Sequence, residues 1–403
     1  MKIGIFFEGN PKMGGGFFQS LKSSILISNI EDYADKFEVI ITDIKSNEYL
    51  KKENIKTKFF KLSTFKRYYA ELFEIDIMRN FLKKIKIKHP FSIFLKKESY
   101  DLVIFLGPSN NVKYCEEVSF VVNIWDLDHI KNSQFPEHNI NSINDFKNNY
   151  IRSIIFKAFK IIVPHENNKT DLINYYKANK KNIIIQNFIP MLPTIYRDSS
   201  KDDAKYKELY QNLKIPSQKK IIFYPAQFWA HKNHKYIVDV AEIMNDKGQN
   251  DYFFVFCGTD KGNYPYIKRV IEEKKIENYF KFLNFISDDE LISLYLNSDA
   301  VLMPTYGGPT NLPLYESFFF KIPIFYSKDL IKDPEINSHL IEIDLENPND
   351  FCEKVEILND NVKIKDITEL SASYFNKTCD ELVFKDNYKK ILDEFVYLQS
   401  RWK

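Results

Sequence analysis

Short apolar runs alternate with amphipathic stretches along all 403 residues, and this alternation limits the fold more than any other feature. In the first half the runs lie at residues 3–7, 39–42, 102–106, 120–124, 161–164 and 183–186. In the second half they lie at residues 221–225, 253–257, 279–282, 300–303, 322–326 and 340–343. Stretches with helical spacing, such as residues 234–245 and 288–297, separate them. This alternation predicts an α/β fold in which each half is a doubly wound parallel sheet with helices on both faces.

The length of the chain also favours two domains, since one core rarely serves so many residues. Residues 190–216 mix prolines and charges without a strand, which is typical of a crossover between domains. We therefore predict a first domain over residues 1–190, a linker over 191–216 and a second domain over 217–385. Residues 386–403 have helical spacing, and we predict a C-terminal helix with the first domain as one packing partner.

The charge balance and the cysteines narrow the class of protein. Lys and Arg number 57 and Asp and Glu number 55, which argues against nucleic acid as the main partner. The four cysteines show no CxxC pairing, so they predict neither a zinc site nor a disulfide framework. No stretch has the length of apolar sequence that a signal peptide or a membrane-spanning helix needs. These features predict a cytoplasmic protein, either soluble or peripherally attached to a membrane.

A glycine-rich loop over residues 14–16 lies between the first strand and a helix. Glycine lets backbone N–H groups approach a ligand, and a helix N-terminus favours an anion such as a diphosphate. We therefore list Gly15 and Gly16 as candidate ligand contacts. A tight structural turn explains the same residues equally well, because the loop is not a GxGxxG motif.

The second half opens with a comparable loop after its first strand. Gln227 and Lys232 are expected at the carboxyl edge of the sheet, where open α/β sheets bind ligands, and Lys232 would hold a phosphate there. An ordinary solvated lysine is the alternative. His231 and His234 resemble a metal pair, but no acidic or cysteine ligand lies near them in sequence, so we predict no metal.

The most specific motif is a glycine-, proline- and asparagine-rich loop that ends in a helix start and Glu316. Asn311 is a good N-cap, and Pro313 suits the first helical turn. The loop would present amides at a helix N-terminus, with a carboxylate just inside to hold ribose hydroxyls. The alternative is that Glu316 is there only because the helix dipole favours it, but this leaves the loop unexplained.

At these residues the chain resembles the retaining family 4 glycosyltransferases of the GT-B fold, which have two Rossmann-like domains with a cleft between them. Glu316 matches the second of two glutamates that this family spaces seven residues apart, and Gly308 stands where the first would be. The residues Gly-Pro-Thr-Asn at 308–311 are similar to a subset associated with bacterial surface polysaccharides. The resemblance implies that amides of Thr310, Asn311 and Leu312 take over the sugar and phosphate contacts.

The resemblance also covers the loop with Lys232, where Gln227 stands in place of the family's arginine and supplies no positive charge. Gly258 matches a strand end, and the backbone near Ile286 is implied to face the base. Lys321 stands where the family usually ends this helix with glycine, which we expect to alter the helix cap and not the chemistry.

In the first half, the loop after residues 120–124 is similar to the family's acceptor-side histidine-aspartate loop. The Trp-Asp-Leu sequence at 125–127, then His129 and the Phe-Pro-Glu sequence at 135–137, match the same subset. The resemblance implies that Asp126 and His129 orient the acceptor hydroxyl or the transferred sugar. Capping of the loop by Asp126 is the alternative.

Residues 79–97 are dense in lysine and interleaved with Phe, Leu and Ile. Such a stretch fits an anionic membrane surface that presents lipid-linked acceptors. A solvated helix face whose apolar side packs on the sheet is the alternative.

Together these residues predict a metal-independent enzyme that transfers a hexose or deoxyhexose, with retention, from a nucleotide-diphosphate sugar to a saccharide acceptor in bacterial surface polysaccharide synthesis (O-antigen, capsule or lipooligosaccharide). No cofactor is expected beyond this donor substrate. The departures at Gly308 and Gln227 leave two alternatives open. One is a catalytically degenerate scaffold of the same fold, and the other is an inverting transferase or an epimerase.

Overall fold

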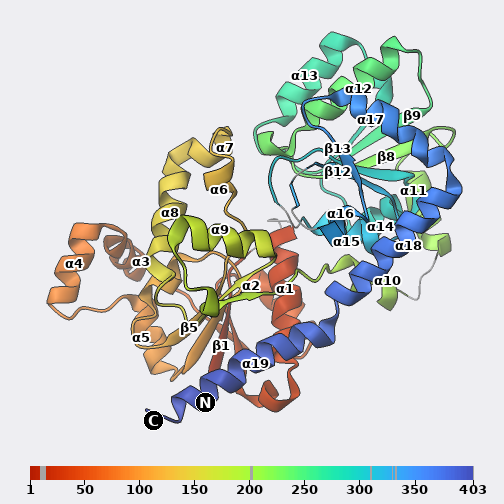
Figure 1. Cartoon of the computed structure of the whole chain (residues 1–403). Coiled ribbons are helices and arrows are strands. Elements are labelled where there is room, and N and C mark those ends of the chain that lie inside the picture. Colours follow the sequence, from red (N-terminus) through yellow and green to blue (C-terminus); the bar gives the residue numbers. More distant parts are fainter. Residues whose placement is uncertain (10–14, 200–202, 309–310, 329, 332–333, 403) are drawn as a thin grey trace. The chain divides into compact units, whose positions relative to one another are not determined.

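The computed structural model describes residues 1–9, 15–199, 203–308, 311–328, 330–331 and 334–402, and the chain packs as two compact units (Figure 1). The first unit contains Met1–Leu127, Asp145–Ile189 and Glu381–Lys403. The second contains Asp128–Asn144 and Pro190–Asp380. Each unit has its own parallel sheet, so the predicted α/β class with two doubly wound halves is confirmed.

The first unit is built on a seven-stranded sheet in the order β3-β2-β1-β4-β5-β6-β7, with every neighbouring pair parallel. Its strands are β1 Ile3–Phe7, β2 Phe37–Ile41, β3 Thr57–Phe59, β4 Leu102–Phe105, β5 Ser119–Asn123, β6 Lys160–Val163 and β7 Ile183–Ile185. The central strands are apolar and buried on both faces, as parallel strands between helical layers must be. Only the short edge strand β3 was not predicted from the sequence.

The helices of the first unit cover its sheet and include the C-terminal one. They are α1 Gly15–Ser28, α2 Ile44–Lys52, α3 Thr64–Glu71, α4 Asp76–Lys84, α5 Pro90–Lys97, α8 Ile143–Ile154, α9 Glu166–Tyr176 and α19 Glu381–Gln399. Figure 1 shows α19 lying along this unit beside α1. Lys22 of α1 pairs with Glu381 at 2.6 Å, and Tyr33 donates to Asp393 at 2.6 Å. The C-terminal helix therefore packs within the first unit.

The second unit is built on a six-stranded parallel sheet in the order β10-β9-β8-β11-β12-β13. Its strands are β8 Lys220–Pro225, β9 Tyr252–Cys257, β10 Phe280–Leu283, β11 Ala300–Met303, β12 Ile324–Ser327 and β13 Ile341–Ile343. The order reverses between β8 and β11, which are neighbours in the sheet. In open α/β sheets, ligands bind beyond the carboxyl ends of the strands at this kind of reversal.

Eleven α-helices are assigned to the second unit within the described residues. They are α6 Asp128–Lys131, α7 Pro136–Asn139, α10 Leu192–Asp198, α11 Asp203–Asn212, α12 His234–Asp246, α13 Tyr264–Lys274, α14 Asp288–Asn297, α15 Leu312–Phe319, α16 Pro334–Asn337, α17 Pro348–Lys354 and α18 Asn361–Thr378. None of the helices in the described ranges is long and apolar enough to cross a membrane.

The structure divides the chain differently from the predicted boundaries of 1–190, 191–216 and 217–385. Residues 191–216 contain α10 and α11, and α11 packs on α14 of the second unit, so this segment is part of that unit's core. Its prolines start helices instead of preventing them, since Pro193 is in the first turn of α10. Residues 128–144 also belong to the second unit, although they lie within the predicted first domain.

Lys321 has a left-handed backbone just after α15, with φ of 56°, where glycine is the usual residue. An L side chain in this conformation costs about 1–2 kcal/mol, and the exposed ion pair of Lys321 with Glu369 recovers about 0–1 kcal/mol. We therefore expect Lys321→Gly to raise the free energy of unfolding by about 0.5–1 kcal/mol, measured by urea denaturation. Lys321→Ala loses the ion pair and keeps the strain, so it should be no more stable than wild type. Equal stability of the two variants would contradict this explanation.

Candidate functional site

Two loops meet at the reversal of strand order in the second unit. One follows β8 and contains the one-turn 3-10 helix η7, Ala230–Lys232, before α12 begins. The other follows β11 and leads to the N-terminus of α15. The backbone N–H of Tyr306 and the hydroxyl of Thr305 both donate to the carbonyl of His231, at 2.9 and 3.4 Å. These bonds hold the two loops against each other.

Tyr224, which is buried, anchors the loop after β8. The Tyr224 hydroxyl donates to the backbone carbonyl of Lys232 at 2.6 Å. Asn233 adopts a left-handed conformation, with φ of 54°, which turns the chain into α12. Asparagine tolerates this conformation better than most residues. As a result, Lys232 is held at the carboxyl edge of the sheet, as its place after a strand predicted.

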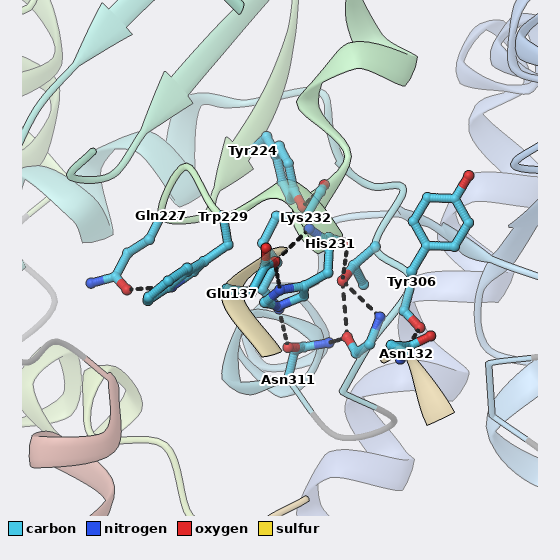
Figure 2. A network of polar contacts seen from close by, with 11 residues as sticks. Asn132, Glu137, Tyr224, Gln227, Trp229, His231, Lys232, Tyr306 and Asn311 are labelled. Atoms are coloured by element: carbon cyan, nitrogen blue, oxygen red, sulfur yellow. Dashed lines mark hydrogen bonds and ion pairs between the residues drawn. The ribbon is translucent and has the colours of Figure 1, made fainter. Parts of the chain in front are cut away.

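The Lys232 ammonium donates to Asn311 Oδ1 at 2.8 Å, which brings the two sequence motifs together (Figure 2). Asn311 is the N-cap residue of α15. Its side-chain oxygen is used by Lys232, and its amide nitrogen donates to the carbonyls of Gly307 and Gly308. A cation and a helix N-terminus therefore lie side by side, and both favour an anion.

Tyr326 supports this arrangement from the end of β12. Its hydroxyl accepts from Asn311 Nδ2 at 2.8 Å and donates to the Gly308 carbonyl at 2.9 Å. Gly308 has φ of +83°, and a methyl group added there would lie 2.7 Å from Asn311 Oδ1. Glycine at 308 is therefore required by both backbone conformation and space.

The segment 128–144 packs on both loops although it lies far away in sequence. Glu137 Oε1 accepts from the backbone N–H of His231 at 2.8 Å and from its Nδ1 at 2.6 Å (Figure 2). Burial, and after it the charge of Lys232, lower the pKa of His231 to about 4, although Glu137 opposes this shift. Burial alone would raise the pKa of Glu137, but the His231 N–H groups hold it below its ordinary value. A neutral imidazole thus donates to a carboxylate and fixes η7 beside Lys232.

The same segment contacts the glycines after β11. Asn132 Nδ2 donates to the Tyr306 carbonyl at 3.0 Å, and the Phe135 ring lies 5.2 Å from the Tyr306 ring. A methyl group added at Gly307 would lie 2.5 Å from Asp128 Oδ2. The backbone of Gly307 therefore lies close to the Asp128 carboxylate, which would have to shift to admit a larger residue at 307.

Glu316 lies in the second turn of α15, with its side chain turned toward α14. Its carboxylate accepts from the buried Tyr295 hydroxyl at 2.8 Å, and the residue is only 7% exposed. Burial raises its pKa to about 7; the Tyr295 hydroxyl opposes this rise, and the charge of Asp288 adds to it. Glu316 therefore exchanges its proton near neutral pH.

Three further candidates border the β8 loop or the helix that follows β10. Gln227 Oε1 accepts from the Trp229 indole at 3.1 Å (Figure 2). The Gly258 N–H donates to the Leu283 carbonyl at 3.1 Å, and a methyl group there would lie 2.2 Å from the Ala226 carbonyl. Glycine at 258 therefore allows β9 to end against the β8 loop. Ile286 is half-buried and precedes Ser287, the N-cap of α14.

The remaining candidates lie in the first unit or in α6. Gly15 begins α1, and the next residue, Gly16, faces the indole ring of Trp125, which a methyl group there would approach within 2.8 Å. Gly107 meets the same ring at the same distance. The structure thus gives Gly16 a packing role that the sequence did not indicate. Asp126 follows β5 in the first unit, whereas His129 is buried in α6 of the second.

Leu312 is the first residue of α15 and Gly308 precedes it in the same loop, so Lys232, Asn311, Leu312 and Gly308 form one neighbourhood. Thr310 lies outside the described residues. Sequence reasoning missed Asp128, Asn132, Glu137 and Tyr326 as parts of the site. The Phe-Pro-Glu match was a signal for Glu137, but Tyr326 was counted only as a core strand residue.

The two histidines of the β8 loop do not act as a pair. His231 bonds to Glu137, while His234 is fully buried and stacks on Phe228 with ring centroids 4.1 Å apart. Among the residues that the structure describes, no group of three or more His, Cys, Asp or Glu side chains could hold a metal ion.

Residues 205–362, which include both loops, match the family model described as glycosyl transferases group 1. This segment is therefore similar to the glycosyl transferases group 1 family. The matched segment covers β8 to β13 and the helices between them, so it contains Lys232, Asn311 and Glu316. None of the curated proteins matches the sequence significantly.

The whole chain also has the fold of solved glycosyltransferase structures, at low sequence identity. HepE from Anabaena, crystallised with UDP, is 13% identical with a TM-score of 0.70, covering 98% of this chain and all of HepE. A glycosyltransferase from Rickettsia africae is 16% identical with a TM-score of 0.70, covering 98% and 99%. WaaG, a glycosyltransferase involved in lipopolysaccharide biosynthesis, is 14% identical with a TM-score of 0.67, covering 96% and 99%. The chain therefore has the GT-B fold, and the matched segment lies within it.

Proposed function

We propose that this protein transfers a hexose or deoxyhexose from a nucleotide-diphosphate sugar to a saccharide acceptor, with retention of configuration and without a metal. The observation that carries the proposal is the bond between Lys232 Nζ and Asn311 Oδ1 at the start of α15. It brings an ammonium group and helix N-terminal amides to one point at the strand-order reversal of the segment that matches the group 1 family.

The chemistry of this point suits a departing nucleotide diphosphate. As the sugar-phosphate bond breaks, negative charge grows on the phosphate oxygen that leaves. Lys232 and the amides of Asn311 and Leu312 would stabilise that charge more strongly in the transition state than in the bound donor. Glu316 would hold ribose hydroxyls once it is ionised, and a phosphate oxygen of the leaving group would accept the acceptor's proton.

Gln227 is the weakest part of the proposed site. Its amide oxygen accepts from the Trp229 indole, and the side chain supplies no charge to a diphosphate. Lys232 therefore carries most of the charge neutralisation that the described side chains of this loop supply. The scaffold alternative gains support here, as it does from the missing glutamate at Gly308, and donor binding separates the two possibilities.

Calorimetric titration with UDP, GDP, ADP and CDP tests the proposal first. UDP is the leading candidate because HepE was crystallised with UDP and with UDP-glucose. We expect one of these nucleotides to bind wild-type protein, and the matching nucleotide sugars should then be consumed with a saccharide acceptor. NMR of the product anomer distinguishes retention from inversion. A protein that binds none of the nucleotides would be a scaffold and not a transferase.

We further propose that the enzyme assembles a bacterial surface polysaccharide on the cytoplasmic face of the membrane. WaaG and WaaB, which share the fold, are named for lipopolysaccharide synthesis. In this chain, α3, α4 and the turn between them expose Phe65 at 81%, Tyr68 at 67% and Ile77 at 80%. Further exposed apolar residues of this apolar–basic surface are Leu72, Ile75, Phe81, Ile85, Ile87 and Ile93.

Positive side chains surround this surface. Exposed cations lie at Lys66, Arg67, Lys84, Lys86 and Lys97. Exposed apolar groups flanked by lysines complement an anionic bilayer, which accepts the apolar groups while its headgroups pair with the lysines. Figure 1 shows α3 and α4 at the side of the first unit, away from its strands.

We expect wild-type protein to pellet with phosphatidylglycerol vesicles at low salt, and less at high salt, because screening weakens the lysine contacts. The triple variant Phe65→Ser, Tyr68→Ser, Ile77→Ser should lose most of this binding. Val362→Ser in α18 is the control, since Val362 is also 71% exposed but lies in the second unit. Equal pelleting of the triple variant and the control would overturn the membrane assignment.

A further inference from the structure

Asp128 lies on α6, the short helix of the segment 128–144 that packs on the glycines of the site. Asp128 begins α6, and Asn132 follows its last residue and donates its backbone N–H to the Asp128 carbonyl at 2.7 Å, so the two side chains lie on the same side of this turn. A methyl group at Gly307 would lie 2.5 Å from Asp128 Oδ2 and 3.3 Å from Asn132 Nδ2. Asn132 also donates to the Tyr306 carbonyl at 3.0 Å, which fixes this side of α6 on the loop.

The Asp128 carboxylate is also close to the groups that hold Lys232. Gly307, which it contacts, accepts from Asn311 Nδ2, and Asn311 Oδ1 accepts from Lys232. Burial raises the pKa of Tyr326, and the charge of Asp128 raises it further, so the carboxylate is within electrostatic reach of that hydroxyl. One negative and one positive side chain thus border the same glycine loop.

The sign of the charge determines which part of a donor each side chain can contact. Lys232 and the N-terminus of α15 attract a diphosphate, whereas a carboxylate repels one. A carboxylate does accept strong hydrogen bonds from neutral hydroxyl groups. Asp128 is therefore suited to the sugar and unsuited to the phosphates of the same molecule.

We infer that Asp128 contacts the hydroxyl groups of the transferred sugar and selects the donor by them, an inference that depends on the proposed transferase function. Position 308 cannot supply such a carboxylate, because its φ of +83° and the nearby Asn311 side chain admit only glycine. Instead, the Asp128 carboxylate, which comes from the distant segment 128–144, lies beside Gly307, the residue before 308. Asp128 thus lies between Asp126 and His129 in the sequence, within the loop that was predicted to be on the acceptor side, but it contacts the sugar of the donor.

The test compares a nucleotide with its nucleotide sugars in wild type and Asp128→Asn. The probes are UDP with UDP-glucose and UDP-galactose, or GDP with GDP-mannose and GDP-fucose, according to the nucleotide that wild type binds. We expect Asp128→Asn to bind the free nucleotide within about twofold of wild type and the preferred nucleotide sugar about tenfold more weakly. Its discrimination between the two sugars should also decrease.

Asp145→Asn is the matched control, because Asp145 is an exposed aspartate of α8. It should leave both affinities unchanged. Equal affinity of wild type and Asp128→Asn for the sugar overturns the inference, and so does an equal loss for nucleotide and sugar, which indicates a structural role for α6. If Asp128→Asn does not fold, Asp128→Glu replaces it, and an unchanged sugar preference in that variant also overturns the inference. Failure of wild type to bind any nucleotide refutes the proposed function instead.

Discussion

Replacing Lys232 by alanine is expected to lower kcat about one hundred- to one thousandfold, because in the proposed reaction its ammonium group stabilises the departing diphosphate. Loss of one preorganised charge in a catalytic site typically has an effect of this size. The effect should be near the upper end, since Gln227 supplies no second charge in the same loop. Turnover of the nucleotide sugar found in the binding screen is the measurement.

Lys235→Ala is the matched control for this variant. Lys235 lies three residues further along, in α12, where it pairs with Asp239 within the same helix. Its removal should change kcat less than twofold. Thermal unfolding of both variants checks that the fold is retained. A wild-type rate in Lys232→Ala, or an equal loss in both variants, would refute the role assigned to Lys232.

Glu316→Gln is expected to remove a pH dependence of donor binding. With a pKa of about 7, Glu316 is mostly protonated at pH 6 and mostly ionised at pH 8. If the ionised form holds the ribose hydroxyls, the affinity of wild type for a nucleotide sugar should rise about tenfold between these pH values. The diphosphate of a nucleotide sugar is already fully ionised in this range, so its own titration does not make the affinity depend on pH.

Protonation of Glu316 should weaken donor binding but stabilise the folded protein. The carboxyl has a pKa of 4.5 when unfolded and about 7 when folded, so the folded state retains the proton between these values. Wild-type stability should therefore fall as pH rises from 4.5 to about 7, by up to about 3 kcal/mol. Glu316→Gln should lack this decrease in urea unfolding. A variant with the wild-type pH profile in both binding and stability would rule out Glu316 as the responsible group.

The strands of both sheets could be predicted from the sequence because they are short runs in which apolar residues predominate. The exception is β3, which has only three residues, none of them buried, at the edge of the sheet. Residues 191–216 were predicted as a linker because prolines and charges are frequent in loops. In the folded protein they form helices that α14 stabilises, and this tertiary contact is not encoded in local propensity.

The site could be predicted in part, because some of its residues are marked by local sequence patterns and others are brought in by tertiary contacts. Lys232 and Asn311 each follow a predicted strand, so their meeting at the sheet edge follows from a parallel topology. Glu137 and Asn132 reach their partners across 94 and 174 residues, and no spacing rule indicates such contacts. Gly16 illustrates an ambiguity of the sequence, because a glycine that admits the Trp125 ring has the same sequence signature as one that admits a phosphate.

The membership of residues 128–144 in the second unit affects how this protein could be recombined with others of the same fold. A chimera joined near residue 190 would keep the strands of the second unit but replace the segment that bonds to His231 and covers Gly307. Its donor loops would then meet a foreign α6 and α7, with different side chains opposite them. Exchange of donor preference between two such enzymes therefore requires two separate pieces of chain to be moved together.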